Sequence, residues 1–358
     1  MGNRMFEFDL QRFADTTISP ELVLKSWAKM AYEGGIHDSF FSRFMGTSPK
    51  AIVHVKTELE KGDGDTITIP LLLPLSGSGI MDDNFMEGNE EALSYRSFKV
   101  GIRMVRNAVR LNGRFEEQKT QINMRKDARS ALSEWLSMWI DTSIFSVLTG
   151  IRPPWDGGAV SVFPFPLYAP SANRVIFGGT ASAESGITTA DKFTADLIGK
   201  AKRAATMNED TAIRPINVDG RNTYVMVIDP YQARDLRDDP KWLEAQKHAN
   251  VRGETNPIFS GALGIYEGVV VHEHNRVPRT DTGSSGGSVG HALFLGAQAV
   301  TFAEGEAPFW REETFDYGNK YGVSIGRMMG LQKSAFKYDG INWEDFGVVN
   351  VMTSSAAD

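Results

Sequence analysis

The sequence predicts an α+β fold, and three observations support that class. Period-two alternation of apolar and polar residues, as in Val53–Lys56 and Thr66–Ile69, indicates strands. Residues 115–149 contain neither glycine nor proline and place apolar side chains three or four apart, as an amphipathic helix does. Strands and helices alternate without a regular strand–helix–strand rhythm, which indicates α+β.

Residues 1–50 are expected to form an arm rather than a domain. Ser19-Pro20 is a helix start, and Gly34-Gly35 ends that helix. The apolar residues of this region are too few to close a core, so another surface must cover them. Contacts with another molecule are therefore predicted for Phe6, Phe8, Phe13, Trp27 and Phe40.

The next region, residues 51–112, is predicted to be extended. Lys61–Asp65 has the composition of a turn, and an acidic tract runs from Asp82 to Glu91. Val100, Ile102 and Met104 form a returning strand. The pattern indicates a long excursion of strands and loop with few apolar residues at its tip.

Residues 115–149 are the strongest helix prediction, ended by Gly150 and Pro153-Pro154. A single helix of this length would span roughly 50 Å. Its first half is heavily charged and its second half is apolar. One end is therefore expected to be solvated or to face a neighbour.

The rest of the chain mixes both kinds of element. Residues 151–186, rich in proline, glycine and aromatic residues, are expected to be an irregular insertion, and 282–290 a mobile Gly/Ser loop. Helices are predicted at 189–207 and at 230–248, the second broken near Pro240. Strands are predicted at 224–228, 268–274 and 292–302, with short strands and turns from 317 to 351.

Composition excludes several classes of protein. The chain has 358 residues, enough for about two domains or one elaborated domain. A formal charge of −7 argues against a dedicated nucleic-acid binder. The absence of cysteine excludes disulfides, thiolate catalysis and Cys-ligated zinc. No signal peptide or membrane span is evident, so we expect a protein made and kept in the cytoplasm.

Several segments, taken together and in order, resemble a known family. It is the tailed-bacteriophage major capsid proteins, in the branch that includes the phage N-four coat protein. The similarity extends from about Met5 to Val351, and the segments that carry it are Met5–Ala14, Asn256–Gly268 with Val269–His274, Ala292–Ala299, Phe315–Lys320 and Asp345–Val349.

The resemblance implies the Hong Kong-type capsid fold, also called the Johnson fold. Its parts would be an N-terminal arm at 1–50, an extended loop with flanking strands at 51–112, a peripheral domain at 113–214 with the spine helix 115–149 and an insertion, an axial domain at 215–290, and a return to the peripheral domain at 291–358.

The implied function is structural: many copies would form the icosahedral head of a tailed phage around double-stranded DNA. The partners would be the chain itself in pentamers and hexamers, portal and scaffolding or decoration proteins, and DNA by non-specific contact, with no membrane. No cofactor, metal or catalytic residue is expected.

Two motifs keep a hydrolase open as an alternative. His272 and His274 share a strand face and could ligate a metal, although a third ligand is not evident. Ser324 lies in a Gly-x-Ser-x-Gly pattern, but that motif needs a later histidine, and the last histidine is His291. A tail or decoration protein is the other alternative.

Charged residues offer a second set of contacts. Glu87, Glu90 and Glu91 belong to the acidic tract, which fits no calcium loop. Arginines recur just downstream and would form one stripe on a helix but not on a strand. They could pair with the acidic tract of an adjacent subunit, contact packaged DNA, or form a solvated face. We favour subunit contacts over DNA contacts for Arg103, Arg106 and Arg110, and a solvated face stays an equal alternative.

Overall fold

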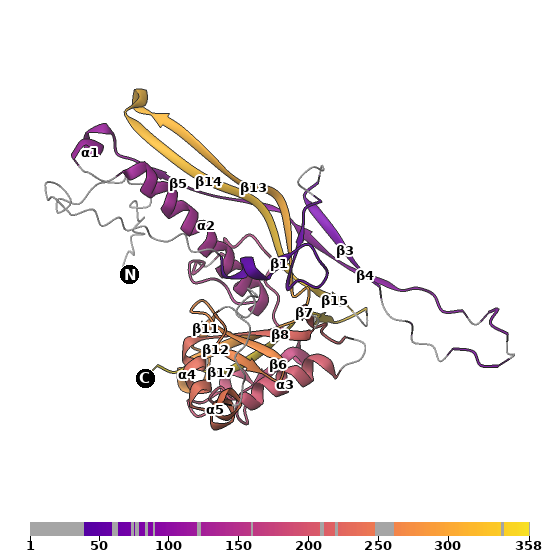
Figure 1. Ribbon diagram of the computed structural model, residues 1–358. Helices are drawn as coiled ribbons and strands as arrows, with labels where there is room; N and C mark the ends of the chain where they lie inside the picture. Colours follow the sequence, from indigo (N-terminus) through magenta and orange to yellow (C-terminus); the bar gives the residue numbers. More distant parts are fainter. Residues whose placement is uncertain are drawn as a thin grey trace, which may run out of the picture. The chain divides into compact units, whose positions relative to one another are not determined.

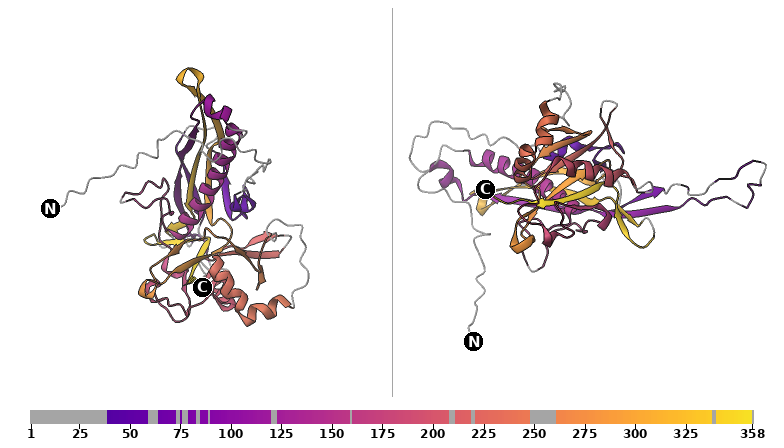
Figure 2. Two further views of the ribbon diagram at one scale, coloured as in Figure 1. Left: turned by 90° about the vertical axis from the view of Figure 1, so that its left-hand side faces the viewer. Right: turned by 90° about the horizontal axis from the view of Figure 1, so that it is seen from below.

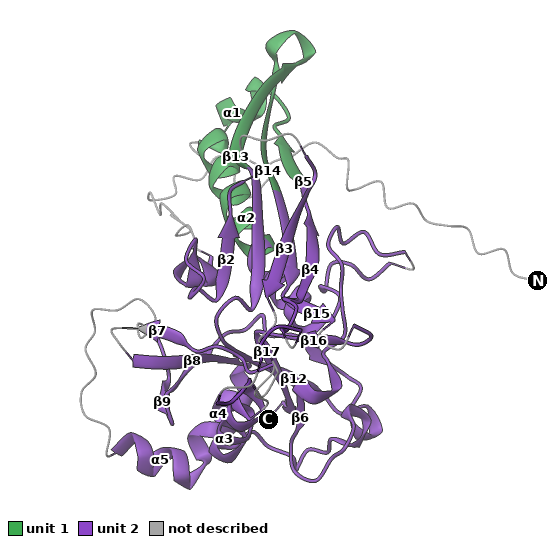
Figure 3. Cartoon of the chain, turned by 90° about the vertical axis from the view of Figure 1, so that its right-hand side faces the viewer, with its two compact units in different colours: residues 1–38, 104–139, 306–328 green, residues 39–103, 140–305, 329–358 purple. Residues whose placement is uncertain are grey.

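The structure is a computed structural model. It describes residues 39–357 apart from 59–63, 73–74, 76–78, 83–84, 89, 120–122, 159, 208–210, 219–220, 248–260 and 338–339. The chain divides into two compact units (Figure 3). Residues 104–139 and 306–328 belong to unit 1, and residues 39–103, 140–305 and 329–358 belong to unit 2, while the remaining residues of unit 1 are not described.

A mixed sheet forms the centre of unit 2, with the order β6-β17-β12-β8-β10-β9. β10 runs parallel to β8 and β6 runs parallel to β17, whereas β12 is antiparallel to both β8 and β17. The strands are β6 (Val175–Phe177), β8 (Arg221–Ile228), β9 (Gly264–Tyr266), β10 (Val269–Glu273), β12 (Val289–Leu295) and β17 (Val348–Ser354), and β7 (Ile216–Val218) and β11 (Arg279–Thr280) pair with β8 and β12.

Helices of unit 2 pack on this sheet, and their starts follow from the sequence (Figure 1). These helices are α3 (Ala195–Thr206), α4 (Pro230–Asp238) and α5 (Pro240–Lys247). Asp229 caps α4 by accepting a hydrogen bond from the backbone N–H of Tyr231, and Pro230 occupies the first turn. The backbone N–H of Ala195 donates to Asp239. The core between helices and sheet includes Phe193, Ile198, Leu236 and Phe294, all fully buried.

Two smaller sheets of unit 2 pack together. β3 (Thr66–Leu72) and β4 (Tyr95–Gly101) form an antiparallel ribbon, and β15 (Ala335–Lys337) pairs with β16 (Trp343–Asp345). Phe98 of the ribbon meets Phe336 edge to face, with ring centroids 5.0 Å apart. Figure 2 shows the chain, with the β3–β4 ribbon, from two further sides. The remaining short strands, β1 (Met45–Gly46) and β2 (Val53–Lys56), run parallel to each other, and β2 pairs with Val300–Ala303 of β13.

Unit 1 combines helices with parts of three strands of the five-stranded sheet β1-β2-β13-β14-β5. It contains α1 (Arg114–Lys119), the first part of α2 (Met124–Thr149) and most of β5 (Arg103–Arg110), together with the outer parts of β13 (Val300–Phe315) and β14 (Lys320–Lys333). β14 lies between β13 and β5, so β5 is the last strand. A tight turn joins β13 to β14 at Asp316–Gly318.

The prediction of one helix over 115–149 is wrong. α2 starts anew at Asn123, whose side chain accepts a hydrogen bond from the backbone N–H of Lys126 at 3.0 Å. Asparagine is a strong N-cap residue, and that signal was present in the sequence. At 1.5 Å per residue, the 26 residues of α2 span about 39 Å.

Several strand boundaries also differ from the predictions. The strand predicted over 292–302 is two strands, β12 and β13, because the chain turns at Gln298, which has a positive φ of 57°. The short strands and turns predicted from 317 to 351 are confirmed in β15, β16 and β17, but they follow one longer strand, the 14-residue β14. The helix predicted from 189 begins at Ala195, and 100–104 is divided between β4 and β5. The break at Pro240 is confirmed.

The predicted domain boundary at residue 290 falls inside β12. β12 and β17 pair along seven residues each and complete the same sheet as β8 and β10. The sheet therefore contains strands from both sides of that boundary. Within 291–358, the strands between β12 and β17 belong to other sheets. The other predicted divisions remain predictions.

Candidate assembly surfaces

The first described residues, Ser39–Phe44, are anchored within unit 2. The Asp141 carboxylate accepts hydrogen bonds from the Ser39 hydroxyl at 2.6 Å and from the backbone N–H groups of Phe40 and Phe41 at 2.8 and 3.2 Å. Burial raises the pKa of Asp141, and these hydrogen bonds partly offset that effect. These contacts hold Ser39, the residue that follows 1–38 in the chain, within unit 2.

Phe40 is therefore a core residue and not an exposed arm contact. It is buried, with its ring 5.2 Å from Phe41 and 6.3 Å from Phe145 of α2. The prediction that it lacks a local core is wrong, because its partners include Phe145 from a distant segment as well as the adjacent Phe41. The other predicted arm contacts, Phe6, Phe8, Phe13 and Trp27, lie outside the described residues.

His272 and His274 point toward the same aromatic cluster. The His274 ring lies 4.6 Å from Phe40 and 5.2 Å from Phe145, and the His272 ring lies 5.5 Å from Phe44. Burial, reinforced by nearby arginines, lowers the pKa of His274 to about 4. Within the described part of the chain, no group of three potential ligands surrounds these histidines.

The segment between β3 and β4 exposes both acidic and apolar residues. Glu87, Glu90 and Glu91 are exposed, and Glu90 accepts a hydrogen bond from the backbone N–H of Gly88. Met81 is 71% exposed and Phe85 is 84% exposed, and Leu75, Met86 and Leu93 are also exposed. The prediction of few apolar residues at this tip is wrong, and in a single subunit these side chains are largely exposed.

The downstream arginines lie on a strand, so they form no single stripe. Arg106 and Arg110 of β5 share one face, whereas Arg103 falls on the other. All three are exposed. Arg114 lies in α1, where it donates a hydrogen bond to the Tyr321 hydroxyl at 3.1 Å. Only Arg106 and Arg110 can act together on one partner surface.

On one face of the unit 1 sheet, charged contacts connect α2 to β13. Glu312 accepts hydrogen bonds from Arg125, at 2.6 Å, and from Arg129. The Arg125 guanidinium also lies 4.9 Å from the centre of the Tyr321 ring. These contacts identify the α2 side of the sheet.

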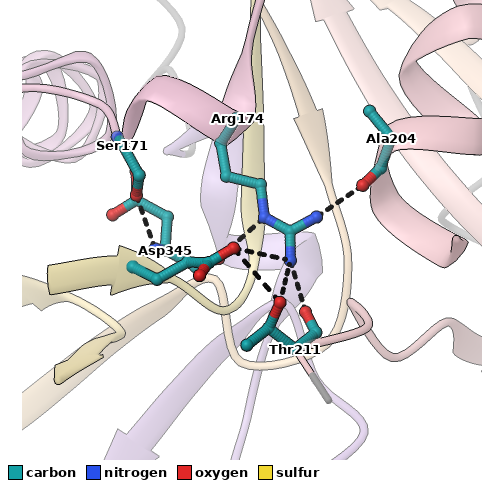
Figure 4. A network of polar contacts seen from close by, with 6 residues as sticks. Ser171, Arg174, Ala204, Thr211 and Asp345 are labelled. Atoms are coloured by element: carbon teal, nitrogen blue, oxygen red, sulfur yellow. Dashed lines mark hydrogen bonds and ion pairs between the residues drawn. The ribbon is translucent and has the colours of Figure 1, made fainter. Parts of the chain in front are cut away.

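Unit 2 contains a buried polar network that the sequence pattern did not predict (Figure 4). Arg174, 1% exposed, donates to the carbonyl oxygens of Asp345, Ala204 and Thr211. Lys333 donates to the carboxylate of Asp345 at 3.0 Å, and both side chains are buried. The network joins four segments that are remote in sequence, which is why no local pattern indicated it.

The insertion and the Gly/Ser loop meet each other. Glu184 of the insertion accepts hydrogen bonds from Thr280, at 2.5 Å, and from Thr282, and it lies 3.2 Å from His291. The hydrogen bond with His291 is the main reason that the pKa of Glu184 falls to about 2. The backbone of Ser284 donates to the Ile187 carbonyl. The start of the Gly/Ser loop is thus held by the insertion, although Ser284–Gly286 are exposed, and the mobility of 282–290 stays a prediction.

Ser324 does not have the geometry of a nucleophile. It lies within the strand β14, without the strand-to-helix turn that a nucleophile elbow requires. Its hydroxyl donates to the Arg311 carbonyl at 3.3 Å. The groove beside it, of about 500 Å³, is lined by arginine, glutamate, methionine and phenylalanine side chains, with no histidine among its described lining residues.

Comparison with known proteins decides the family. The family described as "Phage capsid protein" matches residues 15–357. The chain belongs to the phage capsid protein family. The major capsid protein of Pseudomonas phage KPP25 is 31% identical over 357 residues, which cover 92% of this chain and 94% of that protein.

Solved capsids share the fold of this capsid subunit. The capsid of Ralstonia phage GP4 matches with a TM-score of 0.80 and 31% identity, over 96% of this chain and 99% of that one. The capsid asymmetric unit of cyanophage Pam1 matches with a TM-score of 0.76 and 24% identity, over 96% of this chain and all of that one. The second likeness shows the fold alone.

The protein is a major capsid protein of a phage, a virion component with the α+β Hong Kong-type fold. Neither the hydrolase alternative nor the tail or decoration alternative finds support in these comparisons. Among the described residues, no helix is long and apolar enough to cross a membrane.

Proposed function

We propose that this subunit has a purely structural role and no enzymatic activity. Many copies self-assemble, as pentamers and hexamers, into an icosahedral shell around double-stranded DNA. The subunit is made in the host bacterial cytoplasm and works with portal and scaffolding or decoration proteins. Its contact with DNA is non-specific, in keeping with the net charge of −7.

The exposed tip between β3 and β4 is the observation that carries this proposal. Met81, Phe85 and Met86 are more than 60% exposed, although apolar side chains gain about 25 cal/mol per Å² when they leave water. A cluster of this kind on a projecting segment is characteristic of an interaction site. In a shell of identical subunits, a neighbouring copy covers it.

Acidic residues of the same tip and arginines of β5 add charge to these contacts. We propose Glu87, Glu90 and Glu91 as contact residues on the tip, and Arg103, Arg106 and Arg110 as contact residues on β5. Exposed ion pairs contribute only about 0–1 kcal/mol each. Their effect comes from repetition, because each subunit engages several neighbours at once.

The arm completes the set of proposed contacts. Its anchor on Asp141 fixes where it leaves unit 2. The aromatic residues Phe6, Phe8, Phe13 and Trp27 precede that anchor, and we propose that neighbouring subunits cover them. Deleting residues 1–38 is expected to leave a folded subunit that fails to close shells, as seen by sedimentation.

Microscopy of tip variants tests the proposal. The purified wild-type chain is expected to form closed shells, seen by electron microscopy and sedimentation. The Phe85→Ser, Met86→Ser double variant is expected to stay unassembled and to melt within about 1 °C of the wild-type subunit, because neither residue is buried.

Met207→Ser is the matched control, since Met207 is an equally exposed apolar residue at the end of α3. It is expected to assemble normally. Dispersed wild-type particles would contradict the shell function. Normal shells from the double variant would show that the tip is not a contact.

A further inference from the structure

β5 presents an open edge. It is the last strand of the unit 1 sheet, and within the described residues it pairs only with β14 (Figure 3). Its eight residues, Arg103–Arg110, therefore offer backbone N–H and C=O groups on one side. Such an edge is a template for an added strand.

The two faces of β5 differ in chemistry. Arg106, Ala108 and Arg110 are exposed on one face, where Arg110 lies 5.8 Å from the centre of the Phe315 ring. Val105 and Val109 are half-buried on the opposite face. A strand that added to this edge would meet a basic surface on one side. On the other side it would meet the two valines, with Asn107 between them and the exposed Arg103 at the start of the strand.

Two glycines of β14, Gly322 and Gly326, have neighbouring side chains lying over them on the face that carries Arg106 and Arg110. A Cβ at Gly326 would lie 2.6 Å from the Phe309 ring and 3.0 Å from the Arg106 side chain. A Cβ at Gly322 would lie 2.8 Å from the Phe315 ring. The Gly-x-Ser-x-Gly stretch thus leaves room for side chains of β13 and β5 to lie across the middle strand.

The N-terminal sequence has the complementary pattern. Phe6, Phe8 and Leu10 alternate with Glu7, Asp9 and Gln11. These residues lie outside the described part of the chain. As a strand, they would carry apolar side chains on one face and two carboxylates on the other.

We propose that residues 5–13 of a second copy of this chain add to the free edge of β5 as a strand. Glu7 and Asp9 lie on the side of Arg106 and Arg110, and Phe6 and Phe8 lie on the side of Val105 and Val109. This proposal rests on the proposed shell function and names the occupant of one contact within it.

The spacing of the charges suits this register. Arg106 and Arg110 are about 13 Å apart along the strand, at 3.3 Å per residue. With Asp9 opposite Ala108, its carboxylate lies between the two arginines, within diagonal reach of their long side chains. Glu7 then lies opposite one of them, whether the added strand is parallel or antiparallel.

Chain length permits a neighbour to supply the strand. Residues 14–38 separate the segment from the anchored Ser39, and these 25 residues span up to roughly 80–90 Å when extended. The segment can therefore reach beyond its own subunit.

Cysteine pairs test the proposal, because the natural chain has no cysteine. Shells are assembled from a mixture of an Asp9→Cys chain and an Ala108→Cys chain, and then oxidised. Cysteines that face each other on paired strands have Cβ atoms about 4.5–5.5 Å apart, close to the separation in a disulfide. A covalent dimer on a non-reducing gel is the expected result.

Phe8→Cys is the matched control for strand geometry. Its side chain would lie on the opposite face, so it is expected to give less than a tenth of the dimer with Ala108→Cys. Equal dimer from both pairs, or no dimer in normal shells, overturns the proposal and leaves the shell function intact. Failure of the wild-type chain to form shells overturns both.

Charge reversal distinguishes residues 5–13 from the acidic tip as the segment that contacts Arg106 and Arg110. Glu7→Lys with Asp9→Lys is expected to lower shell yield at least tenfold, and Arg106→Glu with Arg110→Glu is expected to restore part of it. If the arginine reversals instead rescue Glu87→Lys, Glu90→Lys and Glu91→Lys, the tip is the occupant and the proposal is wrong.

Discussion

The central sheet of unit 2 and the outer sheet of unit 1 differ in how they cover their side chains. Every residue of β12 and of β17 is buried. In the outer part of β13, from Glu306 to Phe315, every residue except Phe309 is exposed. The side chains of the central sheet are covered by other parts of the same chain, whereas the outer sheet leaves side chains that other molecules can cover. Stability is therefore expected to depend on the first region and assembly on the second.

The largest expected effect on stability comes from the central sheet. Phe294 of β12 is fully buried, with its ring 4.8 Å from that of Tyr224. Phe294→Ala is expected to lower the free energy of unfolding by about 3–5 kcal/mol, through lost burial and the cavity left behind. Urea unfolding of the unassembled subunit measures it.

Trp310→Ala in β13 is the matched comparison. Trp310 is 43% exposed, so its loss is expected to lower the free energy of unfolding by less than about 1 kcal/mol. If both variants lose the same stability, the contrast between the two sheets fails.

The buried ion pair provides the next largest effect. Lys333→Met leaves the Asp345 carboxylate, 2% exposed, without its cation. A loss of about 3 kcal/mol is expected, because a buried charge without its partner is poorly solvated. Adding Asp345→Asn is expected to recover part of that loss in a double-mutant cycle. Additive losses would mean that the pair is not coupled.

His274 makes stability depend on pH. Its folded pKa of about 4 lies below the ordinary value of 6.5, so the unfolded chain binds the proton more tightly. Its contribution is fully present above pH 6.5 and is lost as pH falls toward 4. The loss is on the order of 3 kcal/mol, at 1.36 kcal/mol per pKa unit.

His274→Asn tests that dependence. It keeps an acceptor for the backbone N–H of Arg276, which donates to His274 Nδ1 at 3.2 Å, but it cannot titrate. The free energy of unfolding measured from pH 7 to 4 is expected to fall less steeply than in wild type. Asp141, whose raised pKa acts in the opposite direction, is unchanged in both proteins. Identical slopes would rule out His274 as the source.

The smallest effect is expected at Ser324. Ser324→Ala removes one hydrogen bond, to the Arg311 carbonyl, and is expected to cost less than about 1 kcal/mol. Shell yield is expected to stay at the wild-type level. Loss of an ester-hydrolysing activity in this variant would revive the hydrolase alternative.

Local pattern predicted the elements that depend on neighbours in sequence. The apolar run of β8, the break between α4 and α5 at Pro240, and the extended character of 66–72 follow from residue type and spacing. The family followed from ordered segments spread along the chain. The 14-residue length of β14 was not predicted, because the side chains that cover its glycines come from β13 and β5.

The sequence by itself determined the fold class, most strands, the acidic character of the exposed tip, and the capsid family. Only the tertiary structure decided that Phe40 is buried, that β12 and β17 share one sheet, and that Arg174, Lys333 and Asp345 converge. The physical reason is distance along the chain. Burial and polar contacts join residues in different elements, up to more than a hundred positions apart for Phe40 and Asp141, and periodicity reports only what lies within one helix or strand.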